Sequence, residues 1–158
     1  MKSSNQQSAA QSHLNARHFN GPIEDRLAIR ELLDSYSDAI IRRDQILWSN
    51  CWAMNAKWRL GSRIIEGRDA ILSHWIDMKT NGRGIKGCYT RAFFNAPGAI
   101  NIDGDKGYGW SYTNELLVDD HNMTYHLHGM YSDLYVRENG QWVFEERSFR
   151  KLHIDHPY

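Results

Sequence analysis

The first half of the chain has apolar residues spaced three or four positions apart, which is the period of an amphipathic helix. This spacing predicts helices over residues 23–42, 45–53 and 67–79. The first of these follows Gly21-Pro22 and has acidic residues in its opening turn, as helix N-termini prefer. Its predicted buried face consists of Ile29, Leu32, Leu33, Tyr36 and Ile40.

The second half of the chain is instead rich in aromatic and β-branched residues, which favour strands. A small hairpin is expected first, over residues 56–60 and 63–66, and long strands over 88–94, 106–118, 123–137 and 141–152. The turn sequences between them are Asp103-Gly104-Asp105, Asp119-Asp120-His121-Asn122 and Glu138-Asn139-Gly140. Helices followed by a meander of strands predict an α+β domain.

The length of 158 residues and the 41% hydrophobic content indicate one globular domain with one core. Residues 1–20 are polar and have no apolar period, so we expect a mobile N-terminal arm. The domain proper is predicted over residues 21–153, and residues 154–158 are predicted to be a C-terminal tail.

Nineteen basic and nineteen acidic residues balance each other, so no overall field attracts nucleic acid or an anionic membrane, and neither is expected as a partner. No window has 18 apolar residues, and the N-terminus has no secretory hydrophobic region. The two cysteines, Cys51 and Cys88, have neither disulfide-framework nor zinc-ligand spacing, although a single disulfide between them is compatible with the sequence. These features favour the cytoplasm.

Several local patterns occur in an order and spacing typical of one family. They are Tyr36-Ser37-Asp38-Ala39, Arg42-Arg43-Asp44, Trp52, Ala56-Lys57-Trp58, Glu66-Gly67-Arg68, Ile102-Asp103-Gly104-Asp105, Gly129-Met130-Tyr131-Ser132-Asp133, Gly140-Gln141-Trp142 and Glu146-Arg147. Over residues 23–152 the chain resembles the SnoaL-like branch of the nuclear-transport-factor-2-like superfamily. The resemblance implies three N-terminal helices packed on a strongly curved, mixed, mostly antiparallel sheet, which forms a cone with an internal cavity.

The family includes dehydratases, dehydrochlorinases, isomerases, polyketide cyclases and non-catalytic binders, so the resemblance alone does not fix a reaction. In the dehydratases and in hexachlorocyclohexane dehydrochlorinase, an Asp near the end of the first helix orients a proton-accepting His, and a Tyr or Lys assists the leaving group. The resemblance places Tyr36 at the assisting position, but Ile41 and Arg91 at the Asp and His positions. The strand that carries the base in ketosteroid isomerase here reads 57–60 and has no carboxylate. Neither mechanism is therefore expected to transfer.

Polar residues on the strands supply the candidate chemistry. Strand alternation places Tyr89, Arg91 and Phe93 on one face of the first long strand, and Arg147, Phe149 and Lys151 on one face of the last. The resemblance turns both faces inward. A buried guanidinium needs a counter-charge, because an unpaired buried charge is costly. The two arginines are therefore expected to bind an anion or to pair with an acid.

Glu115 is a candidate partner for either arginine, on the face that also carries Gly107, Gly109, Ser111 and Thr113. The sequence leaves open which face of this strand points inward. If the face lines the cavity, a Glu–Arg pair would bind a carboxylate or enolate with Glu115 as general base. The alternative is a structural ion pair near the mouth.

Aromatic residues supply the rest of the expected site. Tyr36 is expected either to donate a hydrogen bond to a substrate oxygen or to be a core tyrosine that caps a sheet carbonyl. A wall of apolar area for a cyclic ligand is expected from Trp58, Tyr89, Phe93, Leu127, Tyr131 and Phe149.

His126 and His128 have the i, i+2 spacing that places two side chains on the same side of a strand, as a metal site would need. The resemblance favours Leu127, Gly129 and Tyr131 as the inward residues. That face would turn both histidines outward, so no metal site is expected.

The first hypothesis is therefore an enzyme without a cofactor that eliminates, isomerises or cyclises a medium-sized apolar cyclic substrate. Its expected catalytic residues are Tyr36, Arg91, Glu115 and Arg147. The alternatives are a non-catalytic small-molecule binder and an assembly subunit of a larger enzyme. Exposed aromatic residues on an open sheet face favour a homodimer or homotrimer in each case.

Overall fold

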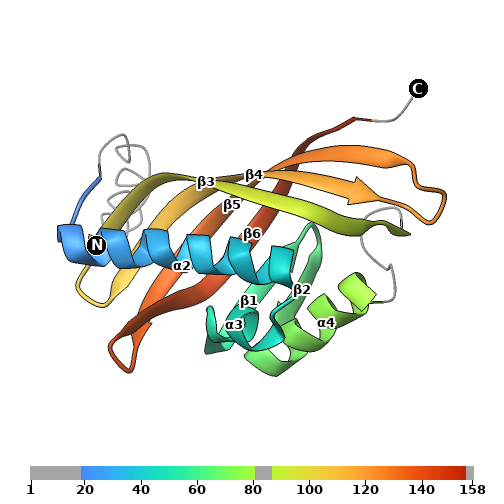
Figure 1. Cartoon of the computed structure of the whole chain (residues 1–158). Helices are drawn as coiled ribbons and strands as arrows, with labels where there is room; N and C mark the ends of the chain where they lie inside the picture. The colour runs from blue at the N-terminus through green and yellow to red at the C-terminus, as the bar shows by residue number, and fades with distance from the viewer. Residues whose placement is uncertain (1–18, 81–86, 156–158) are drawn as a thin grey trace.

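Three helices precede a meander of strands in a computed structural model that describes residues 19–80 and 87–155 (Figure 1). The elements are α2 (Ile23–Arg42), α3 (Gln45–Asn50), β1 (Trp52–Leu60), β2 (Arg63–Glu66), α4 (Arg68–Thr80), β3 (Tyr89–Asp103), β4 (Lys106–Val118), β5 (Thr124–Glu138) and β6 (Gln141–Ile154). The strands form one sheet in the order β2-β1-β6-β5-β4-β3. Neighbouring strands are antiparallel except for the parallel pair β1 and β6. The predicted mixed, mostly antiparallel sheet is confirmed.

The sheet is strongly curved, and α2 runs across it while α3 and α4 lie beside β1 and β2 (Figure 1). The predicted apolar face of α2 is the face that is buried. The helix ends at Arg42, and the left-handed φ of 57° at Arg43 turns the chain. The side chain of Asp44 then accepts a hydrogen bond from Leu47 N–H to begin α3. In the described part of the chain, no helix is long and apolar enough to cross a bilayer.

Residues with left-handed backbone make the turns between the long strands, as the sequence predicts. Gly104 has φ 60° between β3 and β4, and Asn122 has φ 61° between β4 and β5. Asn139 and Gly140 have φ 51° and 79°, which is the pair of positive values that a tight two-residue hairpin requires. These turns set the antiparallel register of β3 to β6.

Two predicted elements end three or more residues away from their predicted ends. The helix expected to reach residue 53 ends at Asn50, because the carbonyl of Cys51 already accepts a hydrogen bond from Phe144 N–H of β6. The strand expected to end at residue 94 continues to Asp103. Pro97 falls inside it and is tolerated because β3 is an edge strand, where the register shifts between Pro97 and Ile100.

The ends of the domain also differ from the prediction. Asn20, assigned above to a mobile arm over residues 1–20, forms a bridge to β3: its N–H donates to Ile100 O at 3.1 Å, and its carbonyl accepts from Ile102 N–H at 3.2 Å. Ile154, assigned to the tail, is the last residue of β6. The rest of the predicted arm, residues 1–18, and residues 156–158 lie outside the described residues.

Candidate functional site

A cavity of about 370 Å³ lies between the inner face of the sheet and helices α2 and α4. This volume is within the range of small-molecule sites, and it is about two and a half times the roughly 150 Å³ cavity that holds benzene. A ligand of one or two fused rings therefore fits. The apolar part of the lining consists of Ile40, Trp58, Leu60, Trp75, Met78, Phe93, Leu117, Leu127 and Phe149, and the part with polar groups of Tyr36, Cys88, Thr90, Glu115, Tyr131 and Lys151.

Seven of the ten predicted site residues lie at this cavity. They are Tyr36, Trp58, Phe93, Glu115, Leu127, Tyr131 and Phe149. The face of β4 that points inward is the one with Gly107, Gly109, Ser111, Thr113 and Glu115, all of them buried. The structure thus shows which face of β4 points into the cavity, which the sequence left open.

The predicted inward face of β3 is wrong at Tyr89 and Arg91. Cys88 and Thr90 line the cavity instead, and Arg91 is exposed. The cause is a register shift between Thr90 and Ala92, where the ladder to β4 skips Arg91. Such a bulge reverses the alternation, so Phe93 returns to the inner face.

The expected position of the catalytic Asp is also turned away from the cavity. Ile41 is 49% exposed on the outer side of α2, whereas the preceding residue, Ile40, is 5% exposed and lines the cavity. Neither Ile41 nor Arg91 can therefore contact a ligand held there.

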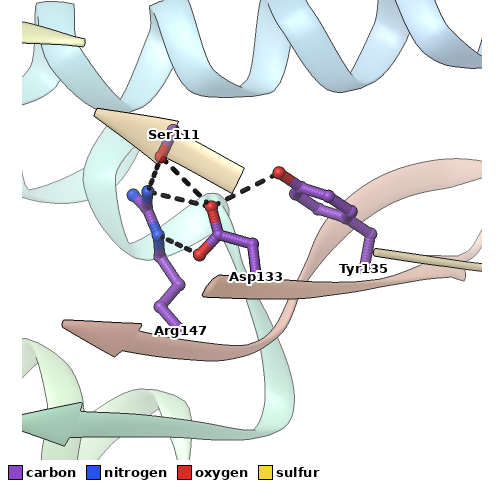
Figure 2. Close-up of polar contacts among 4 residues, drawn as sticks. All are labelled: Ser111, Asp133, Tyr135 and Arg147. Atoms are coloured by element: carbon purple, nitrogen blue, oxygen red, sulfur yellow. Dashed lines mark hydrogen bonds and ion pairs between the residues drawn. The ribbon is translucent and has the colours of Figure 1, made fainter. Parts of the chain in front are cut away.

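Arg147 is fully buried behind the cavity lining, and its partner is Asp133 rather than Glu115 (Figure 2). Its Nε donates to Asp133 Oδ1 at 2.8 Å, and its Nη2 donates to Asp133 Oδ2 and to Ser111 Oγ, each at 3.1 Å. Ser111 and Tyr135 donate to the same carboxylate, each at 3.3 Å. The expectation that Arg147 meets a ligand anion directly is wrong, because the carboxylate of Asp133 already neutralises it.

The guanidinium of Arg147 is packed among aromatic rings. Its Cζ lies 4.3 Å from the ring centre of Tyr36, 3.9 Å from that of Tyr131 and 4.1 Å from that of Phe144. These distances are those of cation–π contacts, which are strongest away from water. Tyr36 and Tyr131 therefore stand between a buried positive charge and the cavity.

Burial raises the pKa of the Tyr36 hydroxyl to about 12, while the charge of Arg147 opposes that shift. Burial likewise raises the pKa of Tyr131 well above its ordinary value. Burial alone would lower the pKa of Arg147, but Asp133 and the two tyrosines more than compensate and raise it. At neutral pH both phenols are thus protonated and the guanidinium is charged.

The two tyrosines also interact through their hydroxyl groups. A hydrogen bond between them lowers the pKa of Tyr36 and raises that of Tyr131. The two phenols therefore act as a coupled pair in the cavity wall. The negative charge of Glu115 raises the pKa of both tyrosines, which places its carboxylate near the pair.

Glu115 is held in the middle of the inner face of the sheet. It is 9% exposed and lies opposite Phe93 on β3 and Leu127 on β5, both of which line the cavity. Lys151, on the same face of β6 as Arg147 and Phe149, also lines the cavity and is exposed, so it lies where the cavity meets solvent.

The outward orientation of the histidine pair is confirmed, because Leu127 and Gly129 are buried while His126 is exposed and His128 half-buried. His128 stacks on His153 with ring centres 6.3 Å apart. Within residues 19–80 and 87–155, no group of three or more His, Cys, Asp or Glu side chains is arranged to hold a metal ion. Cys51 and Cys88 are both buried, and neither forms a disulfide.

Sequence reasoning missed several residues of the site. Asp133 could have been found, because it alternates with Tyr131 and Tyr135 on the inner face of β5. Trp75 lines the cavity, but its apolar spacing in the helix predicted over 67–79 marks it only as a core residue. The inward orientation of Thr90 could not be predicted, because no residue type in this strand indicates the bulge that turns it inward.

Three solved structures illustrate what this architecture is similar to. A scytalone dehydratase-like protein from Novosphingobium aromaticivorans has 19% identity and a TM-score of 0.73, with 86% of this chain and 89% of that one covered. Hexachlorocyclohexane dehydrochlorinase of type 2 has 17% identity and a TM-score of 0.67, over 86% and 90%. A dehydratase-like protein of the NTF2-like family from Streptomyces avermitilis has 16% identity and a TM-score of 0.69, over 84% and 99%. At these identities the likeness shows the fold alone.

Comparison with curated proteins gives no match. The SnoaL-like domain, in contrast, matches residues 21–148, which is most of the chain and includes both Glu115 and Arg147. This match shows that the chain belongs to the SnoaL-like family, with which the curved sheet and its cavity agree.

Proposed function

We propose that the protein is a cofactor-independent enzyme that moves a proton on an apolar carbonyl compound of one or two rings bound in the cavity. The observation that carries this proposal is the pairing of one carboxylate, Glu115, with the hydroxyl pair of Tyr36 and Tyr131 in an otherwise largely apolar cavity. A base and a hydrogen-bond donor that reach the same ligand are what proton transfer next to a carbonyl requires.

In the proposed first step, the Glu115 carboxylate takes a proton from the carbon next to the carbonyl. The electron pair of that C–H bond becomes the C=C bond of an enolate, and the π pair of the C=O bond moves onto the carbonyl oxygen, where Tyr36 donates a hydrogen bond. Tyr131 supports Tyr36 through the hydrogen bond between their hydroxyls, and the charge of Arg147 behind both rings favours the developing negative charge.

The fate of this enolate decides the overall reaction. Return of the proton from Glu115 to a different carbon is an isomerisation, loss of a leaving group from the neighbouring carbon is an elimination, and attack on a second carbonyl is a cyclisation. All three share the same first step, so they require the same two groups.

A deuterium-exchange experiment tests the proposal. The bicyclic ketone 2-tetralone is incubated with the protein in D₂O, and incorporation at the carbons next to the carbonyl is followed by NMR. Glu115→Gln removes the base and should slow the catalysed exchange by about 10²–10⁴-fold. Tyr36→Phe removes one donor to the developing oxyanion and should slow it by about 10²–10³-fold. Exchange no faster than in buffer, or unaffected by either substitution, would refute the proposal.

A non-catalytic small-molecule binder is the second candidate. It is favoured by the outward orientation of Ile41 and Arg91, the positions at which the resemblance expects the catalytic Asp and His. In that case 2-tetralone or a related ligand would raise the melting temperature with concentration but would not exchange its protons.

We further propose that the outer face of the sheet is the contact surface of a homodimer or homotrimer, or of an assembly with a second chain. Phe94, Tyr112 and Leu134 lie on three adjacent strands of this face and are 64%, 48% and 41% exposed. Light scattering of the purified protein distinguishes a monomer from these states. A cytoplasmic location is proposed as well, supported by Cys51 and Cys88 remaining outside any disulfide.

A further inference from the structure

Gly129 lies on the inner face of β5, between two residues that line the cavity, Leu127 and Tyr131. Its φ is not in the left-handed region that favours glycine. The backbone would therefore accept any residue here, and the reason for a glycine has to be sought in the space around it.

The ring of Phe149 occupies the space that a side chain at residue 129 would need. A Cβ built on Gly129 would lie 2.2 Å from Cε2 and 2.6 Å from Cζ of Phe149, and 2.9 Å from Thr113 Oγ1. Carbon atoms in contact are normally about 3.5–4.0 Å apart, so even one methyl group must displace the ring.

The displaced ring has room to move toward the cavity. On one side it packs against Tyr131, with ring centres 5.1 Å apart, and on another against the cluster of Cys88, Leu117 and Leu127. The cavity, which Phe149 already lines, is an open side among the described residues.

We propose that Gly129 and Phe149 together determine the size of the ligand that the cavity accepts. Phe149 occupies the space beside Gly129 and so leaves room for two fused rings in the cavity, and any side chain at residue 129 would push the phenyl ring into that room. This inference rests on the proposed ligand-binding role of the cavity, but not on the chemistry performed there.

Calorimetric titration with cyclohexanone, 2-tetralone and anthrone, which have one, two and three rings, tests the inference. Gly129→Ala should lower the affinity for 2-tetralone by about 10–200-fold, the range for a misfit of methylene size, while cyclohexanone binds as before. Phe149→Ala should admit anthrone, because it removes a volume the size of one benzene ring. The double variant Gly129→Ala/Phe149→Ala should regain 2-tetralone binding. Ser132→Ala, on the outer face of the same strand, is the matched control and should change nothing.

Equal affinities of wild type and folded Gly129→Ala for 2-tetralone would overturn the inference, as would a double variant no better than the single one. If Gly129→Ala fails to fold, Phe149→Ala decides alone, and an unchanged preference for two rings over three refutes the assignment. A shifted size preference without any proton exchange would remove the proposed chemistry and leave this inference standing. Proton exchange together with an unshifted size preference would remove this inference and leave the proposed chemistry standing.

Discussion

The buried ion pair of Arg147 and Asp133 allows a stability prediction with a defined magnitude. Both side chains are 0% exposed, and the guanidinium makes two hydrogen bonds to the carboxylate. Asp133→Asn removes the counter-charge and leaves the cation buried among aromatic rings. Breaking a buried pair in this way costs about 3–5 kcal/mol. Since each kcal/mol shifts the melting temperature of a domain of this size by roughly 2–4 °C, a decrease of about 6–20 °C is expected.

Chemical denaturation of the variant and of a matched surface control measures this effect. Asp38 pairs with Arg42 at 3.2 Å, but the two side chains are 50% and 65% exposed. Asp38→Asn should therefore lower the free energy of unfolding by less than about 0.5 kcal/mol. The double variant Asp133→Leu/Arg147→Met should recover much of the loss, because neither member of the pair then remains as an unpaired buried charge. An equally small effect of Asp133→Asn and Asp38→Asn would refute the reasoning.

Three further predictions follow from single residues. Arg91→Ala should leave 2-tetralone binding and proton exchange unchanged, because the bulge in β3 turns this residue to solvent; a clear loss of either would show that Arg91 reaches the ligand. Asp44→Ala should lower the free energy of unfolding by about 1 kcal/mol, because Leu47 N–H loses its cap. Urea titration measures this difference, and an unchanged free energy of unfolding would contradict the prediction. The pKa of Asp25 is lowered, mainly by the hydrogen bond from Trp142. Its carboxylate therefore stabilises the fold fully at pH values above the unfolded-state pKa of about 3.9. This stabilisation is lost as the pH falls through the lower pKa of the folded state. The melting temperatures of wild type and Asp25→Asn should accordingly differ most near neutral pH and converge in acid, whereas a constant difference would count against this assignment.

The turns and the helix faces could be predicted from the sequence because local chemistry decides them. Gly104, Asn122 and the pair Asn139-Gly140 adopt the left-handed backbone that their residue types permit, and the spacing of apolar residues identified the buried face of α2. The continuation of β3 beyond residue 94 could not be predicted. Pro97 is a strand breaker in most contexts, and only its place on the sheet edge makes it acceptable.

The candidate site was predictable where strand alternation is regular. Glu115, Tyr131 and Phe149 all lie where a period of two places them. The prediction failed at Arg91, which has no partner residue in the ladder between β3 and β4. Because of this one extra residue, the side chains of β3 before Arg91 face the opposite side from the one that regular alternation with Phe93 predicts. The partner of Arg147 was also misjudged, since the choice between Asp133 and Glu115 depends on how far β6 is shifted along β5, which the sequence of either strand does not state.

A crystal structure of the protein with 2-tetralone tests most directly whether the cavity holds a carbonyl compound between its acid and its phenols. The account predicts the ligand inside the cavity, with its carbonyl oxygen about 2.6–3.2 Å from Tyr36 Oη and the carbon next to the carbonyl facing the Glu115 carboxylate. A ligand bound with its oxygen toward Lys151 and solvent, or a cavity that stays closed to it at saturating concentration, would contradict the account.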